Sequence, residues 1–261
     1  MNLLTVYRAT LALHIAAGFI GLAAFWTPAI ARKGGTLHRR AGRVFYFATC
    51  GVAGTGVVIA ALLLAAPLAV HPPRSAVSPE VAAAIVSRIR LTVPFLVYLL
   101  LITFVPVYHG VRVLATRRAP GNLRTPVHTA LNVAAMAASV AMIGLGIALR
   151  QPVFAALSPI GLLVGAGNLQ FARQPYPTPM AWWYEHMGAM IGGGIAFHTA
   201  FLVLGAGRLF GLQLQGPQAA VLWILPTLIG LPASALWVRY YRRTFGELQT
   251  SPAASTAASR S

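Results

Sequence analysis

The residues of this sequence best able to do chemistry are histidines inside or beside long apolar runs. There are seven histidines in all. His14 and His198 are expected at similar depths toward one membrane face, and His109, His128 and His186 toward the other. Neutral imidazole ligates metals, and paired imidazoles on facing helices hold haem iron in bundles. The pattern therefore predicts a b-type haem, with these five histidines as candidate ligands and no metal beyond the haem iron.

Helical geometry restricts the arrangement of such a cofactor. His186 and His198 are twelve residues apart, which corresponds to about 18 Å of rise and about 120° of rotation. Two haems stacked along one helix face are thus disfavoured against one haem or ligands from several helices. The nearby Gly188 and Gly192 would admit a flat macrocycle. We favour the simpler interpretation that they form a seam for close helix packing.

A polar stripe and a single acid accompany the histidines. His128, Asn132 and Ser139 share a face of one apolar run, where they can simply hydrogen-bond to neighbouring helices. Glu185 is the only acid close to an apolar run on the same side. Its expected partner is an arginine, such as Arg43, Arg112 or Arg173, or an imidazole, such as that of His186, which it would orient.

The loop over residues 33–43 is the densest charged feature of the chain. Its glycines expose backbone amides, and its basic side chains could bind a phosphate or an acidic lipid headgroup. The candidate binding residues are Lys33, His38, Arg39 and Arg40. The alternative, which we favour, is an anchor that only sets membrane topology.

Composition excludes several protein classes. The chain is 57% hydrophobic and 9% charged, with a net charge of +17. Soluble chains carry roughly 25% charged residues. The arginines stand at the ends of apolar runs rather than in one patch, which argues against nucleic-acid binding. The sequence has no Asp and no carboxylate expected at mid-membrane, which disfavours ion-coupled transport and hydrolases that need Asp.

Seven apolar runs are long enough to cross a bilayer, which takes roughly 20 residues. We therefore predict an all-α bundle of seven transmembrane helices. The predicted spans are residues 9–31, 44–70, 91–115, 127–149, 153–170, 183–206 and 217–238. The fifth is the weakest, because it is short and has Pro159 in its middle. A cap at Ser78 predicts a short surface helix leading into the third span.

Basic residues predict the orientation of these spans. With the N-terminus outside, 14 basic residues lie inside and six outside, as the positive-inside rule requires. The side of residues 32–43 is thus the predicted inner side, with the C-terminus also inside. Residues 1–245 are predicted to form one transmembrane domain, and residues 246–261 a disordered polar tail. The single Cys50 gives no information on redox compartment.

Short motifs resemble a bacterial membrane-protein family known only as domain of unknown function 2306. The matching residues are His14 with Gly18, Lys33-Gly34-Gly35 with Leu37-His38-Arg39 and Gly42, Tyr108 with Gly110 and Arg112, and His186-Met187-Gly188 with Ile195-Ala196 and Thr199-Ala200-Phe201. His198 departs from the pattern, which has a small or apolar residue there. The resemblance implies a bacterial membrane protein and directs attention to His14, His38, Arg39 and His186, but it implies no activity.

Three functional hypotheses follow for a multi-pass protein of a bacterial inner membrane. The first is a haem-binding or redox protein that uses the intramembrane histidines. The second is a non-enzymatic sensor or assembly protein in which the histidines are structural. The third and weaker is a transporter of a small solute or lipid. Anionic headgroups at the inner face are the expected partners, and the sequence leaves open whether the protein is an enzyme.

Overall fold

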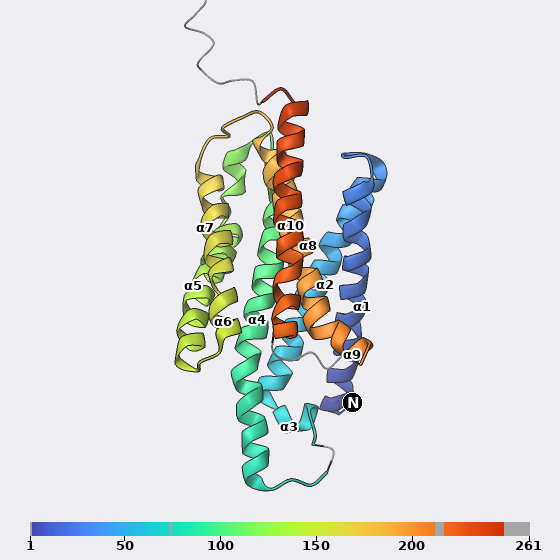
Figure 1. The fold of residues 1–261 in the computed structure, drawn as a ribbon, viewed down its shortest axis with the longest axis vertical. Coiled ribbons are helices and arrows are strands. Elements are labelled where there is room, and N and C mark those ends of the chain that lie inside the picture. The colour runs from blue at the N-terminus through green and yellow to red at the C-terminus, as the bar shows by residue number, and fades with distance from the viewer. Residues whose placement is uncertain (1, 74, 212–216, 248–261) are drawn as a thin grey trace, which may run out of the picture.

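The computed structural model describes residues 2–73, 75–211 and 217–247, and these residues form helices and no strand. Figure 1 shows them as a bundle of long helices. The predicted all-α class is confirmed. The predicted tail lies outside the described residues from 248 onward. Its first two residues, Gly246 and Glu247, are described, and the Glu247 carboxylate accepts hydrogen bonds from the Tyr184 hydroxyl and the Met180 N–H.

Seven helices of the described chain are long and apolar enough to cross a membrane. They are α1 (Leu3–Ile30), α2 (Thr36–Ala65), α4 (Pro79–Thr116), α5 (Pro126–Ala148), α6 with α7 (Pro152–Leu157 and Pro159–Arg173), α8 with η2 (Ala181–Ala200 and Phe201–Ala206), and α10 (Pro217–Thr244). Short connecting helices are α3 (Pro67–Val70), η1 (Pro120–Leu123) and α9 (Gly207–Leu209). The seven predicted spans are confirmed, and the chain is a multi-pass membrane protein.

Helix starts follow the capping residues. The Ser78 hydroxyl accepts from the Val81 N–H, with Pro79 at the first helical position, as predicted. The helix that begins there does not stop before the third span. It runs unbroken for 38 residues, about 57 Å, which exceeds the roughly 45 Å of a whole bilayer. The expected separate surface helix is therefore the projecting first part of α4.

The bundle is organised around α4. This helix contacts α2, α5, α7 and α8, and in Figure 1 it stands between the α1–α2 pair and the α5–α7 group. The seventh span, α10, packs mainly on α8. The third span therefore lies at the centre of the bundle, where its side chains can meet those of most other spans.

The helix of the fifth span is interrupted at Pro159, and the hydroxyl of Tyr98 in α4 bonds the backbone groups beside the interruption. Proline has no N–H, so it interrupts the helical hydrogen-bond ladder. The Tyr98 hydroxyl lies 3.0 and 2.8 Å from the carbonyl oxygens of Leu157 and Ser158, and it accepts from the Gly161 N–H at 3.0 Å. The segment from Pro152 to Arg173 thereby remains long enough to cross the bilayer.

The glycines that allow close packing are not the ones that spacing suggested. A Cβ built on Gly188 meets nothing within 4 Å, and one on Gly192 meets its nearest atom at 4.0 Å. A Cβ on Gly193 instead overlaps the side chain of Val107 in α4. The interpretation of Gly188 and Gly192 as a packing seam is thus wrong, because the face of α8 that meets α4 is rotated by about one residue from it.

Candidate functional site

A cavity of about 940 Å³ lies between α1, α2, α4 and η2 in the predicted outer half of the bundle. Its wall on α1 runs from Tyr7 to Leu22, fifteen residue steps or about 22 Å along the helix. Its wall on α4 runs from Ile85 to Thr103. Ligand sites in proteins typically enclose about 300–1,000 Å³. The cavity is therefore long, largely apolar and of a size that holds a ligand.

Few polar groups of the cavity have free hydrogen-bonding capacity. The Thr92 and Thr103 hydroxyls donate to the carbonyl oxygens of Arg88 and Leu99, one turn back on the same helix. The Arg88 and His71 side chains are exposed at the predicted outer end. The Arg88 guanidinium makes none of the hydrogen bonds or ion pairs found among the described residues. The predicted outer end of the cavity is therefore cationic, while its walls further into the membrane are largely apolar.

His14 is a further polar group that lines the cavity. Its Nδ1 lies 3.0 Å from Oγ1 of Thr55, and that hydroxyl donates its only hydrogen to the Gly51 carbonyl oxygen at 2.6 Å. The Thr55 oxygen can then only accept from the ring. The proton of His14 is thus on Nδ1, and Nε2 carries a lone pair. This tautomer is the one in which a ligating histidine donates through its other nitrogen.

One wall of the cavity is a π-helical stretch. Helix α8 continues as η2, Phe201–Ala206, and Phe201, Leu204 and Gly205 line the cavity. Isolated π turns are rare, and they are common at functional sites. Residue types and spacing do not predict this stretch, and the four-helix boundary of the cavity depends on crossing angles that the sequence does not contain.

A second polar site lies at the predicted inner end, where α4, α5 and α8 meet. Nδ1 of His109 lies 2.9 Å from Nε2 of His128, and Nε2 of His109 lies 3.0 Å from Oε1 of Glu185. Both imidazoles are fully buried, whereas the Glu185 side chain is 30% exposed. Of the partners expected for Glu185, an imidazole is therefore found, and it is that of His109.

Amides extend this site toward α7. Nδ2 of Asn132 donates to the His128 carbonyl oxygen at 2.7 Å, and Nδ2 of Asn168 donates to Oδ1 of Asn132 at 2.8 Å. The predicted bonding of the polar stripe to neighbouring helices is confirmed for Asn132. Three buried polar atoms at this end lack a partner among the described residues, namely Nε of Arg112, Nδ1 of His128 and the Tyr176 hydroxyl.

The remaining predicted ligands are not brought together in pairs. Nδ1 of His198 lies 2.7 Å from the Gly194 carbonyl oxygen, and Nε2 of His198 accepts from the Trp26 indole at 3.1 Å. Both ring nitrogens of His198 thus have partners. His14 bonds instead to Thr55 of α2. His186 bonds through Nδ1 to the Gly110 carbonyl oxygen at 2.9 Å.

His109 and His128 are too close to share an iron atom. Ligating nitrogens on opposite sides of a metal stand roughly 4 Å apart, whereas these two are in direct hydrogen-bond contact. Within the described part of the chain, no group of three or more His, Cys, Asp or Glu side chains could hold a metal ion. Of the five predicted ligands, His14 alone combines a free Nε2 lone pair with a cavity.

The basic loop residues mostly bind the protein's own backbone. Nζ of Lys33 donates at 2.6 and 2.7 Å to two carbonyl oxygens of the last turn of α1, and His38 bonds one of the same oxygens. Nη1 of Arg39 donates to the Gly34 carbonyl oxygen at 2.6 Å. Burial lowers the pKa of the Lys33 ammonium. The Lys33 and His38 contacts cap α1, while Arg40 is exposed.

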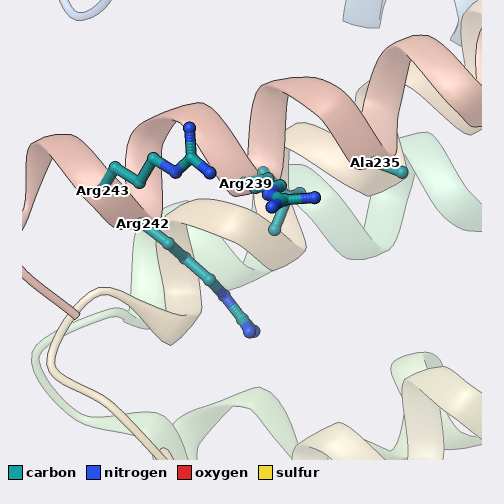
Figure 2. Close-up of a pocket in the computed structure, with 5 residues that line it drawn as sticks. Ala235, Arg239, Arg242 and Arg243 are labelled. Carbon is teal, nitrogen blue, oxygen red and sulfur yellow. The ribbon is translucent and has the colours of Figure 1, made fainter. Parts of the chain in front are cut away.

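A hollow of about 710 Å³ on α10 collects three further basic side chains of the predicted inner side. It is lined by Arg239, Arg242 and Arg243, and Figure 2 shows Arg242 extending away from the helix. The Arg242 guanidinium lies 5.2 Å from the centre of the Tyr184 ring. The spacing of three and four residues puts these arginines on one helix face, a signal that counting charges for topology did not use.

A scan against protein-family models, a search of curated proteins and a search of solved structures each find no match to this chain. The resemblance to domain of unknown function 2306 thus stays a prediction.

Proposed function

We propose that this membrane protein binds a single-chain lipid with an acidic headgroup in the cavity between α1, α2, α4 and η2. The observation that supports this function is the shape and polarity of the cavity, which is largely apolar along about 22 Å. At its predicted outer end lies Arg88, whose guanidinium has no partner among the described residues. That length exceeds the roughly 15 Å of one bilayer leaflet. It accommodates a whole chain with its headgroup at Arg88.

The chemistry of recognition is simple. The chain is held by van der Waals contacts along the apolar walls, because a lipid tail that leaves the bilayer interior is already out of water. The headgroup is held by the guanidinium, which pairs with carboxylate or phosphate oxygens. A neutral alcohol of equal chain length would keep the first contribution and lose the second. Binding of this kind serves either a sensor or a transporter of lipids.

Gly18 offers a way to fill the cavity without disturbing the fold. It lines the cavity, and a Cβ built on it meets nothing within 4 Å. Gly18→Leu is expected to reduce labelling by a photoreactive long-chain fatty acid about tenfold or more, because the new side chain occupies the space of the ligand. Labelling is measured by mass spectrometry on protein in lipid nanodiscs.

Gly54→Leu is the matched control, because its Cβ also meets no atom and the residue is exposed outside the cavity. Arg88→Gln should weaken labelling by the fatty acid about fivefold and leave labelling by the fatty alcohol unchanged. Equal labelling of Gly18→Leu and Gly54→Leu would overturn the proposal. Equal labelling of the parent protein by the fatty acid and the fatty alcohol would also overturn it.

A haem b held through His14 is the second candidate function. It is supported by the Nε2 lone pair of His14, which the Thr55 contact leaves free beside the cavity. Purified protein incubated with haemin should then show a Soret band and, with dithionite, a sharpened α band. His14→Leu should abolish both, whereas His198→Leu should retain them, because both ring nitrogens of His198 are already bonded. A parent protein without these bands would remove the haem hypothesis and leave the lipid proposal intact.

A further inference from the structure

We propose that Glu185, His109 and His128 form a proton relay, in which a proton bound at the buried Nδ1 of His128 leaves the protein from the Glu185 carboxylate. The relay is independent of the cavity and lies at the opposite end of the bundle. Its three groups come from α5, α4 and α8, and two contacts of 2.9 and 3.0 Å join them in a line from a fully buried ring to a partly exposed acid.

The contacts determine where the protons reside at rest. A carboxylate only accepts hydrogen bonds, so Nε2 of His109 carries a hydrogen and donates it to Glu185. In neutral His109 the other nitrogen, Nδ1, then accepts, and Nε2 of His128 must donate to it. Nδ1 of His128 is left with a buried lone pair that has no hydrogen-bond partner in the part of the chain that the structure describes. The resting network is therefore complete except for one proton-accepting atom at its buried end.

Uptake of one proton propagates along this line. A proton that binds Nδ1 of His128 allows its Nε2 hydrogen to pass to Nδ1 of His109, which becomes an imidazolium beside the Glu185 carboxylate. The Nε2 hydrogen of His109 then passes to Oε1 of Glu185, and the exposed carboxylic acid releases it to solvent. One proton enters, one leaves and no electron moves. Both rings then carry their hydrogen on Nδ1, and the resting tautomers return when Glu185 takes up a proton from solvent and the same two transfers run in reverse.

The surroundings limit the pair to a single transferable proton. Nδ2 of Asn132 lies 3.4 Å from Nε2 of His128. At rest both atoms are donors. Once the Nε2 hydrogen of His128 has passed to His109, Nε2 is an acceptor, so Asn132 stabilises the pair after it has bound a proton. The charged and titratable neighbours are Arg112 on α4 and Tyr176 in the loop before α8. The positive charge of Arg112 opposes each proton that binds the pair, and the charge of the first proton opposes a second. Burial, with the nearby charge of Glu185, raises the pKa of Tyr176 and keeps that hydroxyl neutral.

Nitrogen-15 NMR of protein labelled at histidine, in nanodiscs and across a pH series, tests the relay directly. Each imidazole nitrogen reports whether it carries a hydrogen, and His128→Gln assigns the His128 signals. The expected result is a coupled change, in which His109 becomes an imidazolium while His128 moves its hydrogen from Nε2 to Nδ1. Retention of the Nε2 hydrogen by His128 while His109 titrates would identify a static hydrogen-bonded pair and overturn the relay.

Glu185→Gln keeps a hydrogen-bond acceptor and removes the charge. Proton binding by the His109–His128 pair is then expected to weaken about tenfold or more. Glu80→Gln is the matched control, because Glu80 lies in the first turn of α4 at the other end of the bundle. Equal proton affinity in the two variants would show that Glu185 is not the exit group.

Discussion

Gly161→Ala is expected to lower the free energy of unfolding by about 1–3 kcal/mol, although replacing a helical glycine by alanine normally stabilises a helix. Gly161 is buried in α7, where that helix crosses α5 closely. A Cβ there would lie 2.8 Å from the Ala135 carbonyl oxygen and would overlap Oγ of Ser139. A backbone carbonyl cannot rotate away as a side chain can, so the two helices would have to separate.

The cost should extend beyond the pair of helices. The Gly161 N–H donates to the Tyr98 hydroxyl, which also bonds the carbonyl oxygens next to Pro159. A displaced α7 would lose these contacts, and buried polar groups in a membrane have no water to replace them. We therefore expect Gly161→Leu to be more destabilising than Gly161→Ala.

Gly167 provides the control on the same helix. It is exposed, and a Cβ built on it meets nothing within 4 Å, so Gly167→Ala should raise the free energy of unfolding by up to about 1 kcal/mol. Denaturant titration of both variants in one detergent measures the two effects. Shifts of the same sign would mean that close packing against α5 is not the role of Gly161.

The sequence was sufficient for the spans but not for their exact ends. Runs of apolar residues determine how many segments enter a bilayer, because each must bury its backbone polar groups in a helix. Helix ends depend instead on caps and turns. Helix α1 begins at Leu3, where Asn2 caps it, rather than at residue 9.

The sequence predicts the depth of each site residue in the membrane, but not the neighbouring helix that its side chain faces. His109 ends one span and His128 begins the next, so an antiparallel hairpin places both at one end, as expected. Which histidines meet is determined by the rotation of each helix about its axis. His14 and His198 share a predicted depth, yet they hydrogen-bond to Thr55 and Trp26. The cavity was not predictable, because it is the space that four helices do not fill.

Replacing His109 by leucine should lower the free energy of unfolding by about 2–4 kcal/mol. The change removes a fully buried ring that bonds two partners. Glu185 is 30% exposed and can be hydrated. His128 is fully buried, so its Nε2 hydrogen would lose its acceptor, at a cost of about 1–3 kcal/mol. The remainder is the imperfect fit of the new side chain.

The double variant His109→Leu/His128→Leu should therefore be more stable than the single variant. Removing both partners of a buried hydrogen bond costs less than leaving one of them unpaired, and the bond from Asn132 to the main-chain oxygen of residue 128 survives the change. The coupling is measured by denaturant titration of the two single variants and the double variant, with the exposed His71→Leu as a control near zero. A double variant less stable than His109→Leu would mean that the two rings contribute by packing alone, since only a hydrogen bond makes the second substitution favourable.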